Sequence, residues 1–206
     1  MKNLLLILIS SFLLAGCGPD RVLVDELTNK GPNDNSPIYY NEKGLFSGVA
    51  FDIYENGNIF RETDIKDGKR NGTHKEWYEN GQLKILLNVK DNKKDGTCKE
   101  WYENGQLKIL LNLKDHKRDG AYAEFRKDGQ KVQEINYKND EKHGLDRSWY
   151  ENGQLEYEFQ YVNGKRDGSY KWWYENGQLR LEGQYVNGEK DVSTMKGWHE
   201  NGQREY

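Results

Sequence analysis

A 24-residue repeat constrains this chain more than any other feature. The phrase "WYENGQL" recurs unchanged at 77–83, 101–107, 149–155 and 173–179. The glycine of the phrase and its equivalents recurs in five steps of 24 residues and a last step of 25, at Gly57, Gly81, Gly105, Gly129, Gly153, Gly177 and Gly202. A second glycine series precedes the first by nine residues and is broken by Val192. The pattern indicates about seven stacked copies, of which the last is degenerate.

Each copy has the pattern of a β-hairpin. A strand leads to the aromatic pair, the Glu-Asn-Gly corner follows, and the returning strand alternates apolar residues at Leu83, Ile85, Leu87 and Val89. The seven glycines of the first series are therefore expected to be structural turn residues. The predicted fold is all-β: an elongated antiparallel sheet or solenoid of stacked 24-residue hairpins over residues 38–206.

Two corner geometries fit the phrase. A two-residue Asn-Gly turn would set Trp77 on the face opposite Leu83. A three-residue loop ending in a left-handed glycine with a bulge would pair Tyr78 with Gln82 and set Trp77 on the face of Leu83, Ile85 and Leu87. The first copy favours the three-residue loop, because its apolar residues alternate in the phase of Trp77, at Val49, Phe51 and Ile53.

The turn between successive hairpins carries residue types that tolerate positive φ. Its third position is Gly68, Asn92, His116, Asp140, Gly164 and Gly188. We therefore expect a left-handed residue there in each copy, which explains His116 without any chemistry. A sheet of this length with one apolar face is expected to coil or curl, or to bury that face against a partner.

The N-terminal segment has the pattern of an export signal. One Lys precedes an apolar run from Leu4 to Leu14, which is too short for an ordinary membrane-spanning helix. The following Leu14-Ala15-Gly16-Cys17 resembles a bacterial lipobox, which implies cleavage before Cys17 and lipidation of that residue. We expect a signal peptide at 1–16, a lipidated Cys17 with a polar tether over 17–37, and stable anchoring by several acyl chains.

Composition restricts the chemistry of the chain. The formal net charge of −3 gives no argument for nucleic-acid binding. No catalytic triad, phosphate loop or zinc motif is present. His74 and Cys98 share a repeat position in adjacent copies and could be neighbours across the sheet, but two ligands do not make a metal site. The sequence therefore predicts a protein that is not an enzyme and that has no cofactor.

Regular aromatic and charged columns are the candidate contact residues. Partner contact and cross-strand packing both account for the aromatic set, which comprises Tyr54, Tyr78, Tyr102, Tyr150, Tyr174 and Trp172. Glutamates recur at the corners, and basic pairs such as Lys69-Arg70 and Lys93-Lys94 recur at the opposite edge. The basic edge could meet anionic lipid or an acidic partner, or could simply protect exposed turns.

The repeat resembles the MORN-repeat variant family. The residues that carry the resemblance are the paired glycines, such as Gly72 and Gly81, with "WYENGQLK" between and after them, over roughly residues 38–206. Many bacterial members are catalogued as antitoxins of the YwqK group in toxin–antitoxin systems. The resemblance implies binding to other molecules and supplies no catalytic residues. The lipobox departs from a cytosolic antitoxin and implies a toxin that acts at the envelope.

Two functions follow as hypotheses. The first is a membrane-anchored envelope lipoprotein that binds a protein partner, either a toxin, as an immunity protein would, or another envelope protein. The second is a surface scaffold or adhesin that binds envelope lipid, glycan or host material. The sequence does not indicate the oligomeric state.

Overall fold

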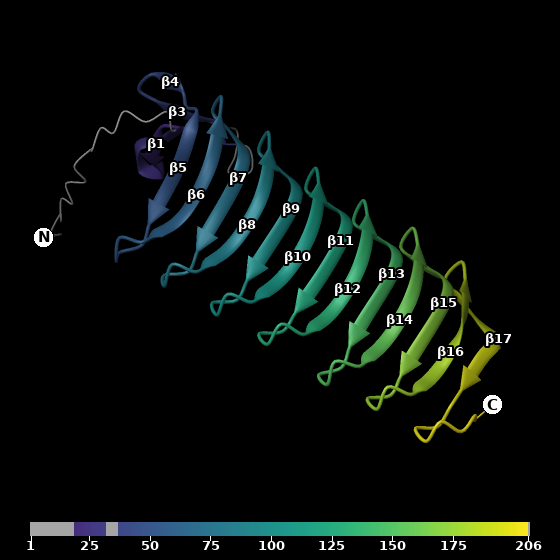
Figure 1. Ribbon diagram of the computed structural model, residues 1–206. Coiled ribbons are helices and arrows are strands. Elements are labelled where there is room, and N and C mark those ends of the chain that lie inside the picture. The colour runs from purple at the N-terminus through teal and green to yellow at the C-terminus, as the bar shows by residue number, and fades with distance from the viewer. Residues whose placement is uncertain (1–18, 32–36, 206) are drawn as a thin grey trace, which may run out of the picture.

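The computed structural model describes residues 19–31 and 37–205. Its main element is an open sheet of 14 strands in the order β1, then β5 to β17 (Figure 1). All neighbouring strands from β5 to β17 are antiparallel, and each pairs with its neighbours in sequence. The predicted all-β array of stacked hairpins is therefore confirmed. Across both described stretches, no helix is long and apolar enough to span a membrane.

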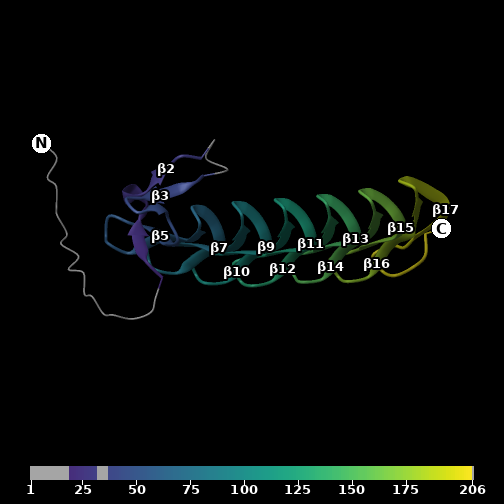
Figure 2. The same ribbon diagram turned by 90° about the horizontal axis from the view of Figure 1, so that it is seen from above.

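Six complete hairpins and a final strand make up the array. Their strands are β5 Gly48–Ile53, β6 Ile59–Lys66, β7 Lys69–Trp77, β8 Leu83–Lys90, β9 Lys93–Trp101, β10 Leu107–Lys114, β11 Lys117–Phe125, β12 Lys131–Lys138, β13 Glu141–Trp149, β14 Leu155–Val162, β15 Lys165–Trp173, β16 Leu179–Val186 and β17 Glu189–Gly197. The strands are bowed, so that the sheet curls across its width (Figure 2).

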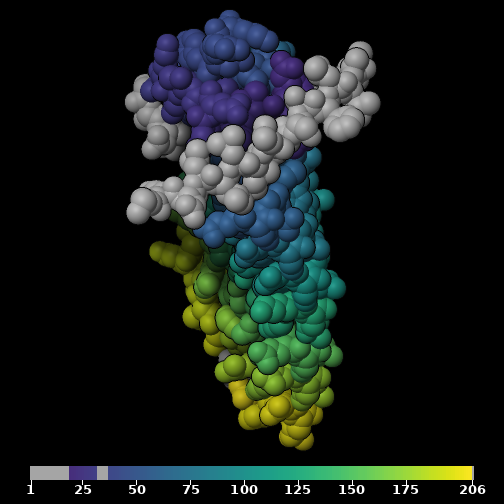
Figure 3. Space-filling model, turned by 90° about the vertical axis from the view of Figure 1, so that its left-hand side faces the viewer, coloured from purple at the N-terminus to yellow at the C-terminus, as the bar shows by residue number. Residues whose placement is uncertain are grey.

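The N-terminal edge of the array is covered by a cap of short elements. Strand β1, Arg21–Leu23, pairs in parallel with β5, and η1, Val24–Glu26, follows it. A small sheet is formed by β2 Thr28–Asn29, β3 Tyr39–Asn41 and β4 Gly44–Leu45. Phe46, Ala50 and Ile65 form the core beneath this cap. Figure 3 shows the cap at one end of the elongated array.

Part of the segment expected to be a tether, 17–37, is thus folded onto the first hairpin. Residues 19–31 supply β1, η1 and β2, and Pro37 is among the most buried of the described residues. The expected signal peptide at 1–16 and the lipidated Cys17 lie outside the described residues.

The corner of each hairpin is the three-residue loop. The Tyr78 N–H donates to the Gln82 carbonyl at 2.8 Å, and the Gly81 N–H donates to the Tyr78 carbonyl at 2.9 Å. Gly81 is left-handed, with φ +85°. Trp77 pairs directly with Leu83. The predicted corner is confirmed, and all seven corner glycines have positive φ.

The prediction of which side chains share a face with Trp77 is partly wrong. After the Trp77–Leu83 pair the register shifts by one residue, so that Glu76 pairs with Ile85. Lys84 is the extra residue, and this bulge reverses the direction of the side chains that follow. Trp77 shares a face with Leu83, as expected, but Ile85 and Leu87 lie on the opposite face. The same shift occurs in all six hairpins.

The sheet therefore has two distinct faces. We call the face that carries His74, Leu87 and Val89 and their equivalents the packed face, because most buried side chains of the array lie on it. Those buried side chains are Ala50, Thr63, Ile65, Leu87, Val89, Ile135, Tyr137, Asp146, Phe159, Tyr161 and Tyr170. The face that carries Trp77, Leu83 and Leu86 and their equivalents is the open face.

The turns between hairpins have two residues, both left-handed. Asp91 and Asn92 have φ values of 47° and 67°, as a type I′ turn requires. The left-handed third position was expected, whereas the left-handed residue before it was not. The Asn92 N–H donates to the Arg70 carbonyl at 2.9 Å, and each later turn bonds in the same way to the second residue of the strand that follows the preceding turn.

A second bulge follows each of these turns and contains the other glycine series. Gly96 has φ +104°, and a Cβ there would lie 2.9 Å from the Asn88 Nδ2 atom. In the degenerate last copy Val192 replaces the glycine and the bulge is larger. Thr194 Oγ1 accepts a hydrogen bond from the Gln184 N–H at 2.9 Å. This larger bulge accommodates the one-residue insertion.

Candidate binding surface

The packed face of the C-terminal copies is filled with aromatic rings. The Phe159 ring stacks on Tyr170 at a centroid distance of 6.0 Å and meets the edge of Trp172 at 5.6 Å. Trp172 also contacts Tyr157 at 5.2 Å. Trp172, predicted as a partner contact, therefore packs within this aromatic cluster.

A column of cations covers these rings. Arg118 lies over Tyr137 at 4.1 Å, Lys142 over Tyr161 at 5.2 Å, and Arg166 over Phe159 at 4.0 Å. The Arg166 guanidinium also donates to the Tyr161 and Tyr185 hydroxyl oxygens, each at 3.2 Å. Such stacking of a cation on a ring is favourable when the pair is shielded from water.

The cations occupy one repeat position, which in four copies is the second residue of a basic pair and which at Lys142 and Lys190 follows a glutamate. They occur once per copy, at Arg70, Lys94, Arg118, Lys142, Arg166 and Lys190. Sequence reasoning placed both residues of each pair on an exposed rim and missed the packed-face position of the second residue. The available signal was Tyr137, Tyr161 and Tyr185, which lie 19 residues after their basic partners.

An ion pair with a buried carboxylate lies in the middle of the packed face. Asp146 is 2% exposed and accepts hydrogen bonds from Lys142 Nζ at 2.6 Å and Gln133 Nε2 at 3.3 Å. Burial lowers the pKa of Lys142, but the Asp146 carboxylate outweighs this effect, so that the pKa is raised. The partly exposed Lys142 thus neutralises a carboxylate that would otherwise be buried unpaired.

In the second and third copies the packed face is hollowed. A pocket of about 660 Å³ has an aliphatic floor of Ile85, Leu87 and Val89. Charged and polar side chains surround this floor, namely Arg70, His74, Glu76, Asn92, Lys94 and His116. An apolar floor with few polar groups at its margin is the usual composition of a binding pocket.

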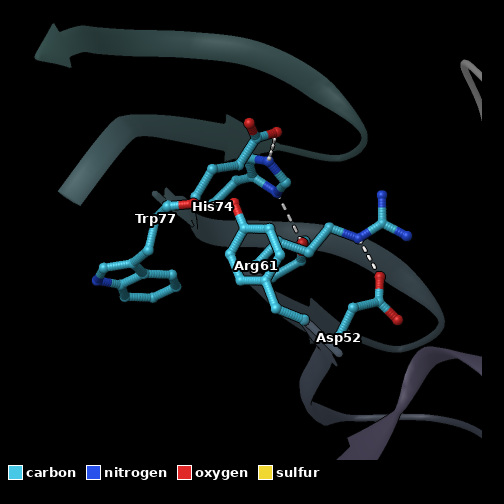
Figure 4. Close-up of polar contacts among 7 residues, drawn as sticks. Asp52, Arg61, His74 and Trp77 are labelled. Carbon is cyan, nitrogen blue, oxygen red and sulfur yellow. Dashed lines mark hydrogen bonds and ion pairs between the residues drawn. The ribbon is translucent and has the colours of Figure 1, made fainter. Parts of the chain in front are cut away.

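His74 lines this pocket, and Figure 4 shows its polar contacts. Its Nδ1 atom lies 2.7 Å from Thr63 Oγ1 and its Nε2 atom 3.1 Å from Glu76 Oε1. A neutral ring that donates from Nε2 to Glu76 accepts the Thr63 hydroxyl proton at Nδ1. Burial lowers the pKa of His74, and Glu76 only partly opposes this effect.

Figure 4 also shows the Trp77 indole pointing away from the His74 ring, as expected for two side chains three residues apart in the same strand. In the first copy Asp52 and Arg61, the equivalents of Glu76 and Ile85, form an ion pair.

His74 and Cys98 are not direct neighbours. Leu87 of β8 pairs with His74 on one side and with Cys98 on the other, so that it separates the two side chains. Burial raises the pKa of the Cys98 thiol. Among the side chains of 19–31 and 37–205, no three His, Cys, Asp or Glu residues are grouped to hold a metal ion.

The tyrosine column joins consecutive copies. Each hydroxyl donates to a backbone carbonyl at the end of a strand in the next copy or, at Trp198, one residue beyond it, at 2.7–2.9 Å. The donors are Tyr54, Tyr78, Tyr102, Tyr150 and Tyr174, and the acceptors are Trp77, Trp101, Phe125, Trp173 and Trp198. In the fourth copy Arg126 takes this place and donates to the Tyr150 carbonyl at 3.4 Å. These bonds account for the period of the column; contact with a partner through the rings stays a prediction.

This protein is an open sheet of repeats that carries aromatic rings and a pocket on one face. These features define its class as a repeat-based binding module. The model of the MORN repeat variant family matches five consecutive segments of this chain, at 70–91, 94–115, 118–139, 142–163 and 166–187. These segments cover more than half of the chain, which therefore belongs to the MORN repeat variant family. No curated protein matches the chain.

Proposed function

We propose that this protein is a non-enzymatic lipoprotein of the bacterial envelope that binds a protein partner along its packed face. In its most concrete form the partner is a toxin that acts at the envelope, and binding neutralises it. The observation that carries the proposal is the pocket of the second and third copies, where charged side chains surround Ile85, Leu87 and Val89.

A protein partner fits this surface better than a bare lipid or glycan. Protein interfaces combine an apolar core with a polar margin, and they favour aromatic residues and arginine. The packed face offers that combination along several consecutive copies. The anchoring part of the proposal is supported by the lipobox at Leu14-Ala15-Gly16-Cys17.

A pair of neighbouring leucines allows a matched test. Leu110 lies on the open face and Leu111 on the packed face, and both are half-buried in β10. The full-length protein, extracted from envelopes in mild detergent, would be compared as wild type, Leu110→Lys and Leu111→Lys by quantitative mass spectrometry of co-purified proteins. We expect one protein to be retained by Leu110→Lys and lost by Leu111→Lys.

Equal retention of that protein by both variants would contradict the role of the packed face. Recovery of lipid or glycan in place of any protein would favour the alternative, a surface scaffold or adhesin. The proposal that the partner is a toxin has a separate test. Cells that carry the Leu111→Lys variant should lose protection against the captured protein when it is expressed in their envelope.

A further inference from the structure

The copies of this array differ in what fills the packed face. One column of that face reads Ile65, Val89, Leu113, Tyr137, Tyr161 and Tyr185 along the chain. In the last three of these copies the tyrosine ring occupies the face and is 9% exposed at Tyr137 and Tyr161. In the second and third copies an aliphatic side chain stands at the same position, and the pocket of about 660 Å³ opens over Val89.

The cations flanking these positions continue from the second copy onward, whereas Phe46 stands at the equivalent position before Ile65. Tyr161 lies between Lys142, at 5.2 Å from its ring, and Arg166, at 3.2 Å from its hydroxyl. The equivalent cations around Val89 are Arg70 and Lys94, and both line the pocket. The setting for an aromatic ring is thus repeated at Val89, although the side chain there is too small to fill it.

We infer that this pocket receives an aromatic side chain from the protein partner, with an acidic residue beside it. This inference rests on the proposed function and names the chemistry of its partner. The ring would take the place that Tyr161 holds three copies later, against Leu87 and Val89. The acidic neighbour would meet Lys94.

The charges at the two ends of the pocket differ, so they favour one orientation of the bound partner segment. Glu76 lies beside His74, whereas Lys94 pairs with Val89 at the other end of the aliphatic floor. His116 also lines the pocket. An acidic group is therefore favoured at the end where Lys94 lies and disfavoured beside Glu76, so that the flanking residues of the partner segment are not interchangeable.

Short synthetic peptides test the chemistry directly. Ac-Asp-Tyr-Glu-NH2, Ac-Asp-Leu-Glu-NH2 and Ac-Lys-Tyr-Lys-NH2 would be titrated into the full-length, methyl-labelled protein and followed by NMR. We expect Ac-Asp-Tyr-Glu-NH2 to bind about tenfold more tightly than either control, as loss of a desolvated cation–ring contact or of charge complementarity implies. Its ring should shift the methyl signals of Leu87 and Val89.

A variant that fills the pocket from within gives the matched control. Val89→Tyr copies the residue of three later copies, so that we expect it to fold and to lose the peptide. Leu86→Tyr adds the same ring on the open face and should bind as the wild type does. If Val89→Tyr does not fold, Lys94→Gln is the second variant. It should weaken the binding of Ac-Asp-Tyr-Glu-NH2 about tenfold, and it should not reduce the lower affinity for Ac-Lys-Tyr-Lys-NH2.

Equal binding of the tyrosine and leucine peptides, or undiminished binding by folded Val89→Tyr, would overturn the inference. So would undiminished binding of the acidic peptide by Lys94→Gln. These failures are distinguishable from failure of the proposed function. If Leu111→Lys loses the protein partner but Val89→Tyr retains it, the packed face is still the interface. In that case only the proposal of an aromatic side chain in the pocket is rejected.

Discussion

The Tyr102 hydroxyl donates a 2.9 Å hydrogen bond to the backbone carbonyl of Phe125, one copy further along the array. The same bond recurs at the other tyrosines of the column, each reaching into the next copy. A repeat protein is stabilised by the interfaces between its units, so these bonds contribute directly to its cooperativity. The column is therefore structural, whatever else its rings contact.

Removing one of these hydroxyls should cost a measurable amount of stability. We expect Tyr102→Phe to lower the free energy of unfolding by about 0.5–1.5 kcal/mol, the usual net value of one hydrogen bond. Tyr170→Phe is the control, because within the described part of the chain its buried hydroxyl has no hydrogen-bond partner. Urea denaturation should give Tyr170→Phe a stability equal to or above that of the wild type. An unchanged Tyr102→Phe would contradict the inter-copy bond.

The corner glycines are required for their backbone conformation. Gly105 has φ +86°, and a Cβ there would lie 3.3 Å from Gln82 Oε1. We expect Gly105→Val to cost about 1–2 kcal/mol or more, since a branched side chain is strained at positive φ. Gly105→Asn should cost less, because Asn tolerates the left-handed region. Similar melting temperatures for Gly105→Val and the wild type would argue against the three-residue corner.

His74 should make stability depend on pH. Burial lowers its pKa in the folded chain, so the unfolded chain binds a proton more readily. The free energy of unfolding should therefore be highest above about pH 6.5, the usual histidine pKa, and should fall as the pH drops through that value. His74→Gln should reduce this dependence relative to the wild type in urea denaturation at about pH 5 and about pH 7.5. The same pH dependence in both proteins would contradict the assignment.

Cys17 tests the anchor. The lipobox predicts that Cys17→Ser abolishes lipidation and releases the protein from membranes, because acyl chains supply the anchoring free energy. Membrane fractionation and immunoblotting would measure the released share. Unchanged membrane association of Cys17→Ser would contradict the lipoprotein assignment.

The array could be predicted from the sequence because the residues that define its turns recur at a fixed spacing. The Asn-Gly corner and the left-handed turn residues are local signals, and they predicted the hairpins, the corner and one of the two left-handed residues in each turn between hairpins. The face of each side chain could not be obtained this way. A single bulge residue, Lys84, reverses the alternation after Leu83, and nothing in the phrase distinguishes a bulged lysine from a paired one.

The site was predicted less well for a related reason. Arg70 and Lys94 belong to basic pairs that have the pattern of exposed turns, and only the register turns the second residue of each pair toward the packed face. The pocket over Val89 depends on a contrast between copies. That contrast is visible in the sequence only once the column containing Tyr137, Tyr161 and Tyr185 is known to lie inside.

The most direct test of the packed face as the binding surface is site-specific photo-crosslinking in living cells. A benzophenone amino acid would replace Leu87 on the packed face or Leu86, its neighbour in β8, on the open face. We predict a protein adduct of defined mass from position 87 and none from position 86. An adduct from position 86 alone, equal adducts from both positions, or none from either would contradict the account.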